Sequence, residues 1–489
     1  MSESFYERLS FFDSTYLAME RPNSYMHIAA ILTFEAGPLA RPDGGVDIDR
    51  IRAFIGSKLS LIPRYRQRLD RVPVDGVPVW VDDAHFSLDY HVRHTALPRP
   101  GTDAELKRLA ARVFAQHLDR SRPLWEIWVI EGLDLDRFAM VIKVHHSMID
   151  GMAGVDILQA IMSLYPTDDV AEAEPWEPRP VPSSTRLLVD EAARIARVPL
   201  DLARNAAGLL SNRAGAQAEL RHRAEAVVNA VRTGWFNRTG TTPVNETLSP
   251  HRRFEWLTVD LDRVKDVKNA LGGTVNDVVL AVVAGAVRAF LGERGVDLDS
   301  LEYRVMVPVS VRPDDEQNRM GNQVAMWLVD MPIAEPDPVK RLSAIRATVE
   351  DLKMSDAALG ATILTQAASW MPLNLLSLGV RLVYAAARPF NMTVTNVPGP
   401  QIPIYLLGSK LLANYPMVPL YMDHGIGVAL FSYDGDIDWG LVADYDLVPD
   451  LDRFAAAISS SLDDLWKAAS RVARAQKRKA ARRAAAGGA

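Results

Sequence analysis

A proline-rich stretch divides this chain into two parts, and each part alternates strand-like and helix-like patterns. Between residues 166 and 182 the sequence turns to proline and acidic residues, a composition that prevents regular structure and indicates a linker. The 489 residues also exceed what one hydrophobic core usually organises. We therefore expect an α/β protein of two domains, with any reaction placed in the cleft between them.

Changes in composition set the expected boundaries. We predict a first domain over 1–165, and a linker with polar, Ala- and Arg-rich amphipathic helices over 166–245. A second domain over 246–470 begins with a new strand at 254–259 and continues into a helix at 275–291, which is apolar nearly all round and so is expected to be buried.

A basic tail over 471–489 carries a charge opposite to that of the rest of the chain. The formal net charge of the whole chain is −6, which argues against a nucleic-acid partner. Such a tail is typical of a frayed, solvated terminus, and the functional alternative is adhesion to anionic lipid. The tail's basic residues, with no acid among them, are Arg471, Arg474, Lys477, Arg478, Lys479, Arg482 and Arg483.

The chain contains no cysteine, which excludes disulfides, thiolate metal sites and a protein-bound thioester. The first 18 residues mix charges with aromatics, unlike a signal peptide, so we expect a cytoplasmic protein. The uncharged run 357–380 is interrupted by Gln366 and Pro372, and we interpret it as a buried helix pair or a surface that dips into a bilayer rather than a membrane span.

Two adjacent histidines, His145 and His146, close a strand-like segment that begins at Phe138. Side chains alternate along a strand, so the two imidazoles point to opposite faces. One metal ion bound by both rings is disfavoured, and a third ligand at zincin spacing is missing, so we expect no metal site.

His146 lies where the strand gives way to a helix, a position from which a side chain projects into a cleft. A neutral imidazole there suits the removal of a proton from an alcohol near neutral pH. Spacing alone favours a satisfied structural histidine instead. Asp150 is expected to cap the following helix or to pair with Arg312, and Gly151 fits a tight turn.

A hairpin brings a second segment close to the histidines. The turn at 131–136 places positions 121–123 across from His145 and His146, so Pro123, Leu124 and Trp125 should lie near the site. Trp125 has core packing as its alternative.

Another helix start carries a second candidate. Thr274 and Asp277 form the pattern of a capping box, which leaves Asn276 free at a helix N-terminus. Such a position favours an oxyanion or a phosphate, and the alternative is a purely structural role. The chain has neither the Gly-x-Ser-x-Gly elbow of α/β-hydrolases nor a nucleotide-binding fingerprint.

Together these motifs resemble those of a known family. The segment from His145 to Gly151 resembles the HHxxxDG signature of the chloramphenicol acetyltransferase-like superfamily. Four further segments resemble motifs of its bacterial wax ester synthase/diacylglycerol acyltransferase branch, in register from about residue 8 to about residue 466. These segments are Pro123–Glu126, Asn276–Asp277, Ser310–Pro313 with Gly321–Asn322, and Asn396–Pro400.

The resemblance implies two chloramphenicol acetyltransferase-like subdomains, each a mixed sheet flanked by helices, with a tunnel at their interface. It makes His146 the general base, without a covalent intermediate. Acyl-CoA is the implied co-substrate and no other cofactor is expected. His145, Asp150 and Gly151 complete the implied catalytic motif. The implied supporting residues are Asn276, Asp277, Pro123, Leu124, Trp125, Arg312 and Asn396.

The implied reaction transfers a long-chain acyl group to diacylglycerol, to a long-chain alcohol, or to both. The apolar segments 357–380 and 402–422 are expected either to line the chain-binding site or to form ordinary core. Two alternatives stay open: a related acyltransferase with another acceptor, and a non-catalytic lipid-binding or droplet-coating protein of the same fold. We expect peripheral association with the inner membrane face or lipid droplets, and the sequence leaves the oligomeric state open.

Overall fold

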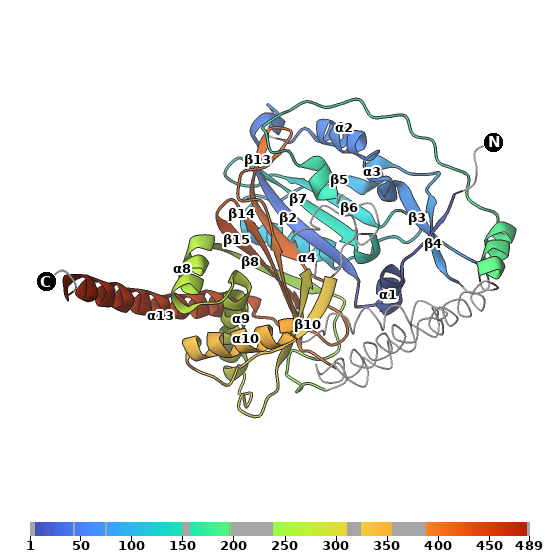
Figure 1. Ribbon diagram of the computed structural model, residues 1–489. Coiled ribbons are helices and arrows are strands. Elements are labelled where there is room, and N and C mark those ends of the chain that lie inside the picture. Colours follow the sequence, from blue (N-terminus) through green and yellow to red (C-terminus); the bar gives the residue numbers. More distant parts are fainter. Residues whose placement is uncertain are drawn as a thin grey trace, which may run out of the picture.

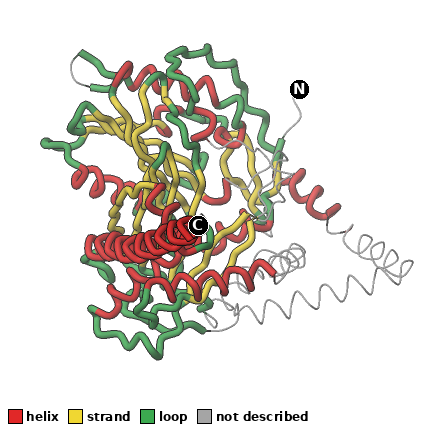
Figure 2. The backbone as a smooth tube through the Cα atoms, turned by 60° about the vertical axis from the view of Figure 1, so that its left-hand side comes forward, coloured by secondary structure: helices red, strands yellow, loops and turns green. Residues whose placement is uncertain are grey.

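The computed structural model describes residues 5–42, 45–73, 76–148, 157–194, 196, 238–310, 324–354 and 388–486. Two six-stranded sheets dominate the fold (Figure 1). In Figure 2, where the long C-terminal helix runs toward the viewer, the strands gather in the middle of the molecule and helices lie around them. This layout confirms the predicted α/β class with mixed sheets flanked by helices.

The first sheet has the strand order β12-β13-β2-β7-β6-β5. All its neighbours are antiparallel except β5 and β6. The first part of the chain supplies β2 (His27–Glu35), β5 (Val92–Ala96), β6 (Trp125–Glu131) and β7 (Arg137–His145) to it. Around it lie α1 (Phe11–Met19), α2 (Ile48–Lys58), α3 (Leu88–His91), α4 (Asp103–Phe114) and α5 (Ile157–Ile161), with a small sheet of β1 (Glu7–Arg8), β3 (Gln67–Arg71) and β4 (Pro78–Asp82).

The second sheet has the order β10-β9-β11-β14-β15-β8. Its strands are β8 (Arg252–Asp260), β9 (Arg304–Ser310), β10 (Val324–Asp330), β11 (Met392–Pro398), β14 (Ile426–Tyr433) and β15 (Asp436–Asp444). Strand β11 runs parallel to both of its neighbours, and the others are antiparallel. The associated helices are α8 (Leu261–Leu271), α9 (Val275–Gly292), α10 (Pro338–Met354) and α13 (Leu451–Ala486).

Helix α9 is the buried centre of the second half, as its sequence predicts. Most of its residues from Asp277 to Leu291 are buried, and they pack in one core with α8, α10, α13 and the sheet. Among the described residues it is the one helix long and apolar enough to cross a membrane, and its burial identifies it as a core helix.

A crossover joins the two halves. Strands β12 (Tyr405–Leu406) and β13 (Ser409–Met417) follow β11 in the chain but belong to the first sheet, where β13 pairs with β2 from Leu411↔Phe34 to Met417↔Ala29. The sequence-based boundaries placed 246–470 in one unit, whereas these two strands complete the other sheet. The interface is close-packed: a Cβ on Gly440 of β15 would meet the carbonyl oxygen of Pro416 in β13 at 1.8 Å.

The linker and the hairpin turn have the structure that was predicted for them, whereas the C-terminal tail does not. Residues 166–183 form no helix or strand, as predicted for a linker. Asp434 and Gly435 have φ angles of 46° and 96° and join β14 to β15 in the predicted hairpin. The expectation of a frayed tail was wrong, because α13 continues to Ala486 and extends away from the body (Figure 1). The amphipathic helices predicted within 166–245 lie largely outside the described residues, as does the segment 357–380.

Candidate active site

The backbone of the histidine pair is held from both sides. Strand β7 ends at His145, and a short 3-10 turn (His146–Met148) follows. The amide of His145 donates to the carbonyl of Leu124 at 2.9 Å, and the amide of His146 donates to the carbonyl of Met26 at 2.8 Å. The flanking segments before β6 and β2 therefore fix where the strand stops and where the His146 side chain leaves it.

The predicted divergence of the two side chains stays a prediction, because His146 lies in the 3-10 turn and not in the strand. His145 is the last residue of β7. It is buried and lies opposite His27 in the β2–β7 register. Its Nδ1 accepts the Ser147 amide at 3.1 Å and lies 2.7 Å from Ser147 Oγ, so its ring proton is on Nε2. That nitrogen lies 3.3 Å from Oε1 of Glu20. His145 thus has an orienting role in the turn.

Glu20 links four segments around the site, although no sequence motif singles it out. It is the residue that ends α1. Besides His145, its carboxylate accepts the Met26 amide at 2.8 Å and an Arg120 guanidinium N–H. Burial alone would raise the pKa of Glu20, but the bonds from His145, Met26 and Arg120 outweigh burial and lower it to about 2. The carboxylate is therefore a fixed negative charge beside the histidines.

Tyr16 contacts the His146 ring directly. The two rings stack with their centroids 4.1 Å apart and their planes 20° from parallel. Tyr16 lies four residues before Glu20, so one face of α1 and its end touch both histidines. No sequence pattern signals this contact, because the two residues are 130 positions apart in the chain.

His146 is suited to accept a proton. Burial of the ring, with a smaller contribution from His145, lowers the pKa of His146 from 6.5 to about 4. Its Nδ1 is buried and has no hydrogen-bond partner among the described residues. A ring with that pKa is neutral at pH 7 and carries a lone pair that is free to accept a proton.

The segment Pro123–Glu126 lies beside the histidines, as the hairpin predicted. Trp125 pairs with Val144 in the β6–β7 register. The alternative interpretation of Trp125 is correct: its ring is buried, its Nε1 donates to the Tyr65 carbonyl at 2.8 Å, and it stacks on His91 with a centroid distance of 4.5 Å. Trp125 therefore supports the strand end without a free polar group.

The capping box at the start of α9 is present. The Thr274 amide donates to Asp277 Oδ2 at 2.7 Å, and the Asp277 amide donates to Thr274 Oγ1 at 3.2 Å. Asn276 is half-buried and its side chain has no hydrogen-bond partner among the described residues. Asn396 is half-buried in β11, opposite Leu430 of β14. Neither has a hydrogen bond to the His146 region in the described structure, so their roles stay predictions.

Three predicted site residues, Asp150, Gly151 and Arg312, lie outside the described residues, together with most of the segment 310–322. Their roles also stay predictions. Within the described residues, no group of three or more His, Asp or Glu side chains could hold a metal ion.

Methionines and aromatics from both halves form an apolar wall next to Tyr16. They come from α1, β9, β10 and the loops before β2, β11 and β14. Methionine side chains adapt readily to an irregular apolar partner, such as an acyl chain. The members of this methionine cluster are Met19, Met26, Met306, Leu328, Phe390 and Tyr421, with Tyr16, Met326 and Met422 packed against them.

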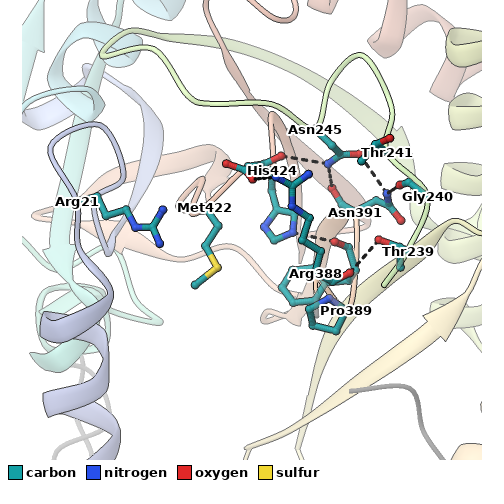
Figure 3. A pocket seen from close by; sticks show the side chains of 12 residues that line it. Arg21, Thr239, Gly240, Thr241, Asn245, Arg388, Pro389, Asn391, Met422 and His424 are labelled. Carbon is teal, nitrogen blue, oxygen red and sulfur yellow. Dashed lines mark hydrogen bonds and ion pairs between the residues drawn. The ribbon is translucent and has the colours of Figure 1, made fainter. Parts of the chain in front are cut away.

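A cavity of about 140 Å³ adjoins the methionine cluster through Phe390 and Met422. Figure 3 shows Arg21, the residue after Glu20, on the opposite side of Met422 from Arg388 and His424. A polar network closes the cavity's far side, where Asn245 Nδ2 donates to the Asn391 carbonyl at 2.8 Å. Both halves of the chain thus meet at this cavity.

Two mixed sheets, the first completed by strands from the second half of the chain, together with a histidine at the end of a central strand and an apolar wall beside it, define an acyltransferase of the chloramphenicol acetyltransferase-like class. The chain belongs to the wax ester synthase/diacylglycerol acyltransferase family. Residues 9–279 match the profile of that family's catalytic domain, and residues 320–466 match the profile of its C-terminal domain.

Relatives and solved structures agree with this assignment. A putative diacylglycerol O-acyltransferase of Mycobacterium tuberculosis is 31% identical over 94% of this chain and 90% of its own length. A probable diacylglycerol O-acyltransferase of the same organism is 32% identical over 93% of this chain and 98% of its own length. The wax ester synthase/diacylglycerol acyltransferase of Marinobacter aquaeolei superposes with a TM-score of 0.67 at 26% identity, covering 95% of this chain and all of the other. A starter condensation domain of rhizomide synthetase shares the fold, with a TM-score of 0.57 at 13% identity. The match covers 95% of this chain and 94% of the other.

Proposed function

We propose that this protein transfers a long-chain acyl group from acyl-CoA to the hydroxyl group of diacylglycerol, of a long-chain alcohol, or of both. Family membership and the names of the relatives support this reaction. The observation that carries it is the neutral, ring-stacked His146 at the end of β7, beside the methionine cluster.

The chemistry follows from the position of His146. Its ring takes the proton of the acceptor hydroxyl while the oxygen attacks the thioester carbonyl. The tetrahedral intermediate collapses, the carbon–sulfur bond breaks, and CoA leaves as a thiolate that recovers the proton from His146. No group of the protein bonds to the acyl chain, which agrees with the absence of cysteine. Tyr16 and the Met26 carbonyl hold the base in place through the ring and the backbone.

The test supplies purified protein with palmitoyl-CoA and either diacylglycerol or hexadecanol, side by side, and measures free CoA and neutral lipid. We expect product from at least one acceptor. His146→Ala should abolish it, whereas His85→Ala, an exposed histidine on the surface, should not. Absence of product from every long-chain acceptor would exclude the proposed reaction.

A non-catalytic lipid-binding or droplet-coating role is the second candidate, and the methionine cluster by itself would serve it equally well. It predicts that the protein binds neutral lipid without releasing CoA and that His146→Ala changes nothing. A different acceptor, as in condensation domains, predicts turnover with an amine or a carrier-bound acceptor and none with diacylglycerol or hexadecanol.

We further propose peripheral attachment to the cytoplasmic membrane face or to lipid droplets through the end of α13. The support is a helix that continues past Ser470 with seven basic residues and no acid in its last part. Each basic residue near an anionic surface contributes about 1 kcal/mol. A chain truncated after Ser470 should lose binding to phosphatidylglycerol vesicles; unchanged binding would refute the proposal.

A further inference from the structure

A fully buried lysine lies two residues before the histidine pair. Lys143 of β7 is 0% exposed, and its side chain extends from the first sheet to the end of α4. Lysine is almost never fully buried without partners, because the removal of its ammonium group from water is costly. A methionine would fill the same space without that cost. The reason for the charge therefore lies in the groups that it binds.

The ammonium group binds the C-terminal end of α4. Its Nζ donates to the carbonyls of Val113 and Gln116 at 3.0 and 3.1 Å, and it lies 3.5 Å from Oε2 of Glu126 on β6. The end of a helix exposes carbonyl groups that lack an amide partner within the helix, and it carries the negative end of the helix dipole. Lys143 thus supplies hydrogen bonds and a positive charge where a helix end favours both.

Glu126 balances this charge within the core. Its carboxylate accepts hydrogen bonds from Arg93 Nη2 at 3.1 Å and from Trp128 Nε1 at 3.0 Å. Burial lowers the pKa of Lys143, and the charge of Glu126 acts in the opposite direction. The three charged groups form one hydrogen-bonded network, so the loss of one member leaves another charge buried with fewer partners.

A histidine of β2 binds the same helix end. His27 is buried, and its Nε2 donates to the carbonyl of Phe114 at 2.6 Å. Burial keeps the pKa of His27 well below 6.5, so the ring is neutral and this nitrogen carries its proton. His27 directly follows Met26, whose carbonyl accepts the His146 amide at 2.8 Å. We call the bonds from Lys143 and His27 to the end of α4 the α4-end clamp.

The α4-end clamp holds the start of a loop that reaches the histidine pair. Residues 115–124 join α4 to β6 without helix or strand. Arg120 in this loop donates to the carboxylate of Glu20, which lies 3.3 Å from His145 Nε2. Leu124, the last residue of the loop, accepts the His145 amide at 2.9 Å. Strand β7 therefore fixes both ends of the loop, one through the side chain of Lys143 and the other through the backbone of His145.

From this arrangement we propose that Lys143 is a positioning residue for acyl transfer. Through the α4-end clamp it holds the loop where Arg120 and Leu124 orient His145, and with it the turn that carries His146. Lys143 itself does not touch substrate. When the clamp is lost, the loop shifts and the base spends less time in the reactive geometry. The kinetic consequence rests on the proposed function, whereas the hold on the loop does not.

The kinetic test compares Lys143→Met with Lys143→Met/Glu126→Gln. The single variant leaves the Glu126 carboxylate buried with one partner fewer, and the double variant removes that charge, so it should regain most of the lost thermal stability. We expect kcat to lie about tenfold below the wild-type value in both, with the KM for palmitoyl-CoA little changed. Recovery of kcat together with stability would overturn the proposal. The double variant decides the question by itself if the single one does not fold.

Two further variants supply the control and test the route. Lys410 lies on β13 of the same sheet and pairs with Asp434 at 3.1 Å, so Lys410→Met should keep the wild-type kcat. Arg120→Met removes the bond from the loop to Glu20 and should lower kcat. Combined with Lys143→Met, its loss should be smaller than the product of the two single losses, because both act through one loop. Losses that multiply fully would contradict this route.

Hydrogen exchange followed by mass spectrometry gives a readout that does not depend on turnover. In Lys143→Met/Glu126→Gln, amide exchange should rise about tenfold in residues 116–124 and in the turn after His145, while α9 keeps its wild-type rates. Unchanged exchange in the loop would refute the proposal. A wild-type protein without acyl transfer whose variant still shows this local rise would contradict the proposed reaction, but not the hold of Lys143 on the loop.

Discussion

The ring of Tyr16 lies flat against the ring of His146, with the centroids 4.1 Å apart. The first helix of the protein therefore sets the plane of the proposed base, although 130 residues separate the two in sequence. Glu20, at the end of the same helix, holds the Met26 amide at 2.8 Å, and the Met26 carbonyl accepts the His146 amide. The ring and the backbone of His146 thus depend on one helix.

The Tyr16 contact should control turnover more than folding. Aromatic pairs of this kind contribute about 0.5 to 1.5 kcal/mol, and a base that loses its orientation spends less time in the reactive geometry. We expect Tyr16→Ala to lower kcat about tenfold and Tyr16→Phe, which keeps the ring, to retain at least half of the activity. Steady-state kinetics and a thermal melt on each variant check this; equal kcat values for the two would contradict it.

Glu20 should stabilise the fold in a pH-dependent way. Its folded pKa of about 2 lies below the ordinary value of 4.5, so its contribution is present above pH 4.5 and is lost as the pH falls toward 2. The difference corresponds to about 3 kcal/mol at pH 7. We expect Glu20→Gln to lower the free energy of unfolding in urea at pH 7 by that order, and by less at pH 3.

Glu35→Gln is the matched control for Glu20, because Glu35 ends β2 and is exposed. Its unfolding free energy should equal that of the wild type at both pH values. A Glu20→Gln effect that is the same at pH 7 and pH 3 would contradict the assignment of a charged, hydrogen-bonded carboxylate.

The lowered pKa of His146 predicts an unusual pH profile. With a folded pKa of about 4, the base is neutral and active from pH 5 upward, and kcat/KM falls only below that. An unperturbed histidine of pKa 6.5 would retain about 3% of its neutral form at pH 5. Measuring kcat/KM at pH 5 and pH 7.5, with circular dichroism to verify the fold, distinguishes the two; a drop of more than tenfold at pH 5 would be inconsistent with burial.

The crossover should be intolerant of added volume. Because a Cβ at Gly440 would meet the Pro416 carbonyl at 1.8 Å, Gly440→Ala must push β15 away from β13. We expect a loss of roughly 1 to 3 kcal/mol in unfolding free energy. Gly292→Ala, where the nearest contact is Leu298 Cδ1 at 3.7 Å, should be neutral or slightly stabilising. Similar melting temperatures for the two variants would show that β15 and β13 are not closely packed at Gly440.

Local features of the fold were predictable from the sequence because they follow local rules. The Thr274–Asp277 box follows from capping chemistry, and the hairpin at Asp434 follows from its turn residues. The burial of α9 follows from its composition alone.

Long-range features were not predictable in this way. The insertion of β13 beside β2 and the convergence of Glu20 on His145 join segments that are far apart in the chain. Neither feature produces a hydrophobic periodicity or a motif spacing that can be recognised in the sequence, because the packing of the whole core determines strand order and side-chain pairing. The helical end of α13 was missed for another reason, because a run of like charges conceals the strong helix propensity of its alanines.

The central claim is that His146 is the general base, and one comparison tests it most directly. Wild-type protein and His146→Ala, both shown to be folded, are given palmitoyl-CoA with the better of diacylglycerol and hexadecanol, and CoA release is followed with a thiol reagent. We predict a fall in kcat of about 100- to 10,000-fold with little change in the binding of acyl-CoA. An alanine variant that keeps more than about a tenth of the wild-type rate would contradict the role of His146.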